Sequence, residues 1–212
     1  KTGDTMRFFT IILLFVLLLF MSPAIHHSQE ITTVFSRQTS DIKLYGLPVE
    51  LNTPNDISDI IAQYQYDAYP LPASFLPYLD EIVIIEQKEI DEEFSANTSG
   101  YTRTYFLDDQ YTGSTIYLSD SLFRETTLLH EALHVIDARF QFSASAQFQK
   151  LCEAEMDNEY NARIITYYDP QYHCSEYFVE SYINYLYDPE TFQQLQPRTY
   201  DFIYEANNQI NS

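Results

Sequence analysis

The sequence predicts an α+β fold, and the order of its segments leads to this prediction. Short segments rich in β-branched and aromatic residues lie before residue 120, whereas longer segments with helical periodicity fill the rest of the chain. Strands followed by helices, rather than strands alternating with helices, are typical of α+β domains. The 212 residues contain only four glycines, with no internal repeat and no low-complexity linker. We therefore expect one domain over residues 41–212.

The predicted elements of the first half are short. In chain order they are a helix over residues 55–66, a strand over 82–85, a loop over 91–100, and strands over 101–107 and 115–118. Asp56 is expected to cap the helix, because a carboxylate can accept hydrogen bonds from the first free backbone N–H groups. The run Ile82–Ile85 is short and entirely β-branched, which favours a buried strand.

The second half is predicted to be helical, with short polar connections. Helices are expected over residues 124–140, 145–165, 175–187 and 199–208, where apolar side chains recur at helical spacing. Two cysteines, Cys152 and Cys174, lie in this half. Their spacing does not fit a Cys-x-x-Cys zinc site, and a disulfide and a pair of buried free thiols both remain open.

The N-terminus has the pattern of a secretory signal peptide over residues 1–24. Arg7 precedes an unbroken apolar run, and Ser22 and Ala24 place small residues before a cleavage site. The run is shorter than the roughly 20 residues of a membrane span, which favours cleavage over the rival interpretation of a retained membrane anchor. Met6 stands just before Arg7, so it is open whether residues 1–5 belong to the native protein.

The charge of the chain excludes several classes of partner. There are 11 Lys and Arg against 31 Asp and Glu, a net charge of −20. Phosphate binding needs clustered cations, so we expect no nucleic-acid partner and no docking on anionic lipid. With an exposed polar leader over residues 25–40, the mature protein is expected to be an extracellular, secreted monomer without stable membrane association.

His130, Glu131 and His134 form a His-Glu-x-x-His motif within the helix expected over residues 124–140. Positions i and i+4 share one face of a helix, so both imidazoles can point at one metal ion. Zinc accepts histidine nitrogen and lowers the pKa of a bound water to about 7. Glu131 can then take the proton of that water as general base. An apolar stripe that would anchor this helix is formed by Leu129, Leu133 and Ile136.

The third metal ligand is expected to be a glutamate on a later helix, because the metzincin extension of the motif is absent. Glu176 and Glu180 share one face of an otherwise aromatic helix, where two like charges are unfavourable unless a cation neutralises them. Glu176 is the preferred ligand, and Glu180 is expected to orient a ligand histidine. Glu180 itself and the pair Glu153 and Glu155 are the alternatives.

Asp137 lies three residues after His134 and has two interpretations. It can hydrogen-bond a ligand imidazole, or it can be an ordinary solvated aspartate.

These motifs resemble a known family of zinc peptidases. His130–Asp137 together with Glu176–Ser181 is similar to the C-terminal peptidase domain of anthrax lethal factor and to the small secreted Pro-Pro endopeptidases. Pro197–Ile203 is similar to a stretch at the corresponding end of those domains, and the likeness covers roughly residues 115–205. The size of the chain and its signal peptide are closer to the Pro-Pro endopeptidases than to a multidomain toxin.

The resemblance implies a zincin-like fold with His130, His134 and Glu176 as ligands of one zinc ion, and with Glu131 as base. It also implies a tyrosine that stabilises the oxyanion, seven residues before the ligand glutamate. That position is Asp169, so Tyr168 is preferred and Tyr172 is the alternative. A second departure is Leu133, where the relatives commonly have glycine.

The expected function is that of a secreted zinc-dependent endopeptidase acting on a peptide or protein in extended conformation. Preference for proline-containing sites follows from the resemblance alone. The strand over residues 115–118 is expected to be the edge that pairs with substrate, with residues 108–114 as a flap. The alternative is a zincin-like binding or adhesion module without catalysis, against which the glutamate within the motif speaks.

Overall fold

The computed structural model describes residues 38–94, 97–156 and 172–212. The chain divides into two compact units, residues 1–34 and 35–212, and the first of them lies outside the described residues. The predicted signal peptide and most of the expected leader lie outside them as well. No helix of the described part is long and apolar enough to cross a membrane.

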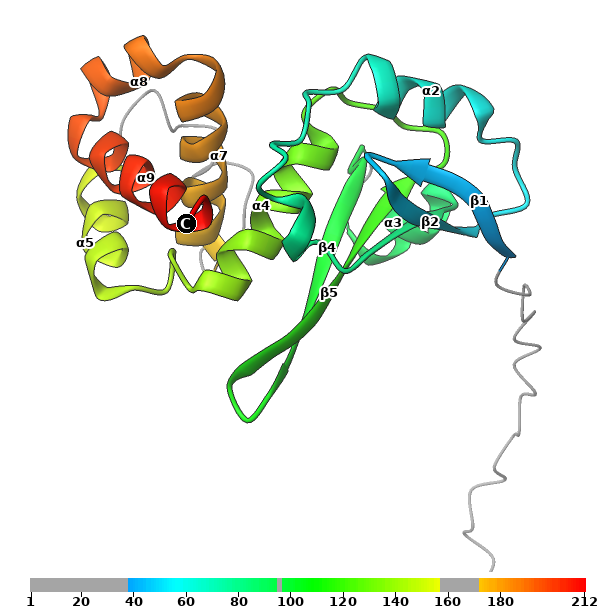
Figure 1. Ribbon diagram of the computed structural model, residues 1–212, viewed down its shortest axis with the longest axis horizontal. Helices are drawn as coiled ribbons and strands as arrows, with labels where there is room; N and C mark the ends of the chain where they lie inside the picture. Colours follow the sequence, from blue (N-terminus) through cyan, green and yellow to red (C-terminus); the bar gives the residue numbers. More distant parts are fainter. Residues whose placement is uncertain (1–37, 95–96, 157–171) are drawn as a thin grey trace, which may run out of the picture. The chain divides into compact units, whose positions relative to one another are not determined.

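A five-stranded sheet forms one part of the second unit (Figure 1). Its strands are β1 (Gln38–Leu44), β2 (Leu47–Asn52), β3 (Glu81–Ile85), β4 (Gly100–Leu107) and β5 (Gln110–Ser119). The spatial order is β1-β2-β3-β5-β4. β2, β3 and β5 run parallel, whereas β1 and β4 are antiparallel to their neighbours. β4 is therefore an edge strand, paired only with β5 among the described strands.

Both faces of the sheet carry apolar side chains. Along β3, Ile82 and Ile84 join the main hydrophobic cluster, while Val83 and Ile85 join a smaller one on the opposite face. This alternation follows from the period of two of a β-strand. The helix α3 (Gln87–Glu93) contributes Ile90 to the smaller cluster, and all other described helices contribute side chains to the main one.

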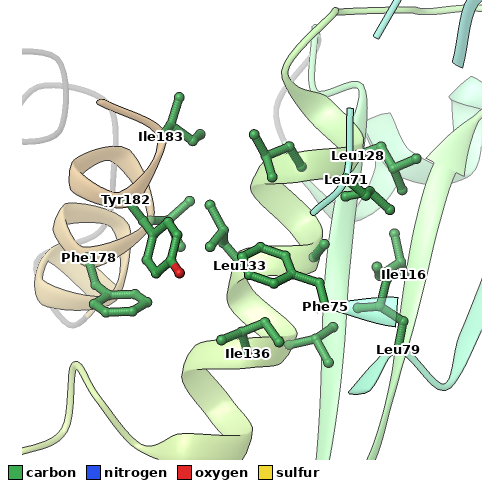
Figure 2. Close-up of a cluster of buried hydrophobic side chains, with 14 of the residues drawn as sticks. Leu71, Phe75, Leu79, Ile116, Leu128, Leu133, Ile136, Phe178, Tyr182 and Ile183 are labelled. Carbon is green, nitrogen blue, oxygen red and sulfur yellow. The ribbon is translucent and has the colours of Figure 1, made fainter. Parts of the chain in front are cut away.

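The remaining helices build the rest of the unit. They are α2 (Ser58–Tyr66), α4 (Thr127–Phe140), α5 (Ala146–Glu155), α7 (His173–Tyr187), α8 (Pro189–Leu195) and α9 (Pro197–Ile210), with a 3₁₀ turn at Leu76–Tyr78. α4 lies between the sheet and α7, as the close-up of the core shows (Figure 2). Leu133 of α4 lies in one cluster with Ile116 of β5 and Phe178 of α7.

The predicted α+β composition is confirmed, and most predicted elements are present within a few residues. α4 begins at Thr127 rather than residue 124, and α7 begins two residues before the expected start. The expected helix over residues 145–165 is α5 as far as Glu155, and its remainder lies outside the described residues. The strands β1 and β2, the helices α3 and α8 and the 3₁₀ turn at Leu76–Tyr78 were not predicted.

The prediction for the substrate edge is wrong. Residues 115–118 belong to the longer strand β5, which lies between β3 and β4 and has no free edge. The loop expected over residues 108–114 is shorter than predicted, because β4 and β5 form a hairpin whose turn is Asp108–Asp109, and its role as a flap stays a prediction. Both aspartates have positive φ, 50° and 62°, as a two-residue hairpin turn requires.

Gly100 sets how closely the edge strand approaches α4. A Cβ atom there would lie 2.8 Å from Cγ2 of Thr127 and 2.8 Å from the backbone oxygen of Tyr117. We expect Gly100→Ala to lower the free energy of unfolding by about 1–3 kcal/mol, because the added methyl group must push the strand and helix apart. Chemical denaturation measures this change.

Gly113 on the paired strand provides the matched control. A Cβ there would meet only Oδ2 of Asp80, at 3.8 Å. Gly113→Ala is therefore expected to change stability by no more than about 0.5 kcal/mol. Equal losses for both variants would show that the close approach at Gly100 does not limit the packing.

Candidate metal centre

The helix α4, which carries the His-Glu-x-x-His motif, is anchored by a buried apolar face. Leu129, Leu133 and Ile136, the predicted apolar stripe, are fully buried in the main hydrophobic cluster. Since the side chains three and four residues apart lie on one face, this stripe leaves His130 and His134 together on a neighbouring face. Both imidazoles are only partly exposed, at 13% and 18% of their side-chain surface.

Three side-chain donor atoms converge, two from α4 and one from α7. The Nε2 atoms of His130 and His134 lie 3.2 Å apart. The carboxylate of Glu176 places Oε1 at 3.2 Å from Nε2 of His134 and Oε2 at 3.3 Å from Nε2 of His130. A tetrahedral zinc ion with bonds of about 2.0–2.1 Å holds neighbouring donors about 3.3 Å apart. The cluster can therefore hold a metal ion.

The hydrogen bonding of Glu176 fits a cation at this place. Its side chain is buried, and Oε2 has no hydrogen-bond donor although it is shielded from water. A buried carboxylate oxygen without a partner is costly, and a cation removes that cost. The alternative ligand Glu155 lies elsewhere, where it accepts a hydrogen bond from Thr199 at 2.6 Å and pairs with Arg198. Glu153 is exposed.

The pKa values of the three groups show that the site attracts positive charge. Burial alone would lower the pKa of His130, but the neighbouring carboxylates of Glu176 and Glu180 raise it well above its ordinary value. Burial would likewise lower the pKa of His134, but the negative charge of Glu176 outweighs it and raises that pKa. For Glu176 itself, burial favours the neutral acid, and the two imidazoles outweigh it and lower the pKa of the carboxyl group.

Glu131 is not one of the three donor residues, but it is close enough for its charge to act on both imidazoles. Its carboxylate is buried, and Oε2 accepts a hydrogen bond of 2.9 Å from Oγ1 of Thr102 on β4. The same hydroxyl lies 3.0 Å from the backbone oxygen of Glu131, so it has two alternative acceptors on one residue. The edge strand thus contacts the residue that was predicted to be the base.

Each imidazole has a polar partner behind it. Nδ1 of His130 lies 3.5 Å from Oε1 of Glu180, in the arrangement predicted for this glutamate. Nδ1 of His134 lies 3.3 Å from Oγ of Ser175, which donates to Oδ2 of Asp137 at 3.0 Å. Asp137 is buried, which excludes the interpretation as a solvated aspartate, and it reaches the imidazole through Ser175 rather than directly.

Asp137 has an unusual environment for a carboxylate. Burial raises the pKa of its carboxyl group above the ordinary value, although hydrogen bonds from Ser143 and the charge of His134 act in the opposite direction. The backbone N–H of Ser143 donates to Oδ1 at 2.7 Å, and its hydroxyl donates to Oδ2 at 2.6 Å.

A disulfide joins Cys152 of α5 to Cys174 of α7, which settles the choice that the sequence left open. Cys174 lies two residues before Glu176, so the bond anchors the start of the helix that supplies the third donor. A disulfide is typical of proteins in an oxidising compartment.

Tyr168, the predicted oxyanion tyrosine, lies outside the described residues. The alternative, Tyr172, stands at the N-cap position of α7 without a side-chain capping hydrogen bond, and 57% of its surface is exposed.

Two residues of the centre were not predicted, Thr102 and Ser175. Strand alternation places Thr102 and Thr104 on one face of β4, but no sequence signal indicates that this face meets Glu131. Ser175 directly precedes Glu176, and only the packing of α7 on α4 brings its hydroxyl to His134.

Comparisons with known proteins found no relative: no family model, no curated protein and no solved structure matches the chain. The chemistry of the centre is therefore inferred from its own residues.

Proposed function

We propose that the chain is a secreted zinc-dependent endopeptidase that binds one zinc ion through His130, His134 and Glu176. The observation that carries this proposal is the place of Glu131, a buried carboxylate close enough to act on both imidazoles and hydrogen-bonded to Thr102. An ion with a purely structural role has no use for a base at this position. Two histidines and one carboxylate also bind iron in some oxygenases, so the base is what favours hydrolysis.

Each residue of the centre has a separate role in the proposed peptide hydrolysis. Zinc bound at the centre would supply a Lewis acid that polarises the scissile carbonyl and increases the acidity of water. Glu131 accepts the proton of the attacking water and passes it to the leaving amine. Thr102 donates a hydrogen bond to Glu131 and so orients the carboxylate. Tyr168, or Tyr172 as the alternative, would donate a hydrogen bond to the oxyanion.

The free edge of β4 is where we propose that the substrate binds. An extended peptide can add to an exposed edge strand through its backbone N–H and C=O groups. Because Thr102 of this strand touches Glu131, a peptide aligned along β4 passes close to the base. This replaces the strand over residues 115–118, which the sequence favoured. Preference for proline near the scissile bond remains a proposal from the resemblance.

The family, the location and the state of association are parts of the same proposal. The donor set, the position of Glu131 and the contact between Glu180 and His130 support a zincin-like fold. The disulfide supports an extracellular location. The net charge of −20 supports a partner that is neither nucleic acid nor anionic membrane, and we propose a secreted monomer.

Metal analysis combined with peptide profiling tests the proposal. We expect the purified chain to contain one zinc ion and to cleave members of a library of unstructured peptides. Bound zinc without cleavage of any peptide would contradict the endopeptidase and favour the alternative, a binding or adhesion module. Iron in place of zinc would contradict the proposed chemistry.

A further inference from the structure

The two imidazoles of the centre are supported in different ways. Nδ1 of His130 faces the carboxylate of Glu180 directly, whereas Nδ1 of His134 faces the hydroxyl of Ser175. An imidazole that binds a cation through Nε2 carries its hydrogen on Nδ1 and needs an acceptor there. A hydroxyl can be that acceptor only if its own hydrogen is directed to another group.

The hydrogen of Ser175 is directed to Asp137. Oγ of Ser175 donates to Oδ2 of Asp137 at 3.0 Å. A serine hydroxyl has one hydrogen, so toward His134 its oxygen acts as acceptor. The hydrogen bonds then run in one direction, from Nδ1–H of His134 to Ser175 and from Ser175 to Asp137. This leaves the lone pair of Nε2 of His134 facing Glu176, whose Oε1 lies 3.2 Å away.

Asp137, the last acceptor in this series of hydrogen bonds, is held in place by further contacts. Asp137 lies on α4 with only 5% of its surface exposed, and Ser143 donates to both of its oxygens. The carboxylate therefore accepts three hydrogen bonds from two serines, and its position depends on Ser143 as well as on Ser175. Of these two serines, Ser175 is the one whose hydroxyl is hydrogen-bonded to His134.

We propose that Ser175 is a positioning residue: it donates a hydrogen bond to the buried carboxylate of Asp137 and accepts one from Nδ1–H of His134. This fixes the orientation of the imidazole and leaves the lone pair of Nε2 available to a cation. The proposal rests on the metal site of the proposed function and not on peptide hydrolysis. It also gives α7 two roles at neighbouring positions, since Glu176 supplies a donor atom and Ser175 orients another.

Zinc affinity of matched serine variants tests this proposal. We expect Ser175→Ala to weaken zinc binding by about 10- to 100-fold, the usual cost of losing the hydrogen-bond partner of a ligand imidazole. Ser143→Ala removes a hydroxyl from the same carboxylate without touching His134, and its loss is expected to stay below about tenfold. Ser175→Thr keeps the hydroxyl and is expected to restore most of the affinity. Competition with a chromophoric chelator measures all three.

A spectroscopic measurement on the wild-type chain does not depend on the folding of any variant. Nitrogen NMR of the imidazoles in the zinc-free protein, at a pH where His134 is neutral, is expected to show the hydrogen of His134 on Nδ1. A hydrogen on Nε2 would overturn the proposal, and so would equal affinity losses for Ser175→Ala and Ser143→Ala. Failure of the proposed function is distinguishable, because a wild-type chain that binds zinc and cleaves no peptide leaves the affinity ratios of the variants unaffected.

Discussion

Glu131→Gln is expected to abolish peptide cleavage while the chain keeps its zinc. Glutamine has the size of glutamate and retains an oxygen that can accept the hydrogen bond from Thr102, but it cannot take a proton from water. The loss of a positioned general base typically costs 10²–10⁴ in rate, so we expect kcat to fall by about that factor. KM is expected to change little, because Glu131 does not belong to the proposed substrate edge on β4. Steady-state kinetics and metal analysis of the same preparation measure both effects.

Glu125→Gln is the matched control for this variant. Glu125 carries the same side chain at an exposed position just before α4, so its replacement should leave kcat unchanged. Cleavage by Glu131→Gln at the wild-type rate would refute the mechanism. Loss of zinc from Glu131→Gln would show that this carboxylate is a ligand rather than a base.

The donor set was predictable because its information is local. The i, i+4 spacing of His130 and His134 fixes their common face as soon as the segment is helical, and α4 is helical as predicted. The same spacing holds for Glu176 and Glu180 on α7. An unfavourable pair of like charges in an aromatic helix favoured Glu176 as the third donor, with Glu180 and the pair Glu153 and Glu155 left as alternatives. The structure then brings Glu176 to both Nε2 atoms.

The order of the strands was not predictable in the same way. The hairpin β4–β5 is local, but the parallel pairing of β3 with β5 joins residues more than thirty positions apart. No residue in the run 115–118 indicates which side of that strand is covered, so the free edge was assigned to the wrong strand. β1 and β2 were missed because their turn is Tyr45–Gly46, a pair without the usual Asn-Gly or Asp-Gly signal.

The hydrogen-bond partners of the imidazoles were also only partly predictable from the sequence. Asp137 could be named because it lies one helical turn from His134, but its connection through Ser175 depends on the distance between two helices. Ser143, which holds Asp137, lies after the C-terminus of α4, where Gln141 takes a positive φ of 58° and reverses the chain. A sequence pattern does not contain the distances between helices, so Ser143 and Ser175 cannot be told from ordinary surface serines.

Glu176→Gln is expected to weaken zinc binding far more than Glu180→Gln. The carboxylate of Glu176 lies 3.2 Å and 3.3 Å from the two Nε2 atoms, so its replacement by glutamine exchanges a charged oxygen donor for a weaker neutral one and removes the negative charge that balances the ion. Glu180 lies 3.5 Å from Nδ1 of His130, on the far side of the ring, and acts on the ion only through the imidazole. Loss of such an outer partner costs about 10- to 100-fold in affinity, and loss of the ligand itself should exceed the upper end of that range.

Glu153→Gln completes this series, because the sequence left Glu153 open as a ligand and the structure places it at an exposed position of α5. It is expected to bind zinc as the wild type does. All three variants replace one glutamate by its neutral isostere, so a general effect of lowering the negative charge of the chain would weaken binding equally in each. If Glu180→Gln bound zinc more weakly than Glu176→Gln, Glu180 would be the ligand and Glu176 the residue that orients His130. A loss confined to Glu153→Gln would move the third donor to α5, since the disulfide from Cys152 to Cys174 ties both helices together near the centre.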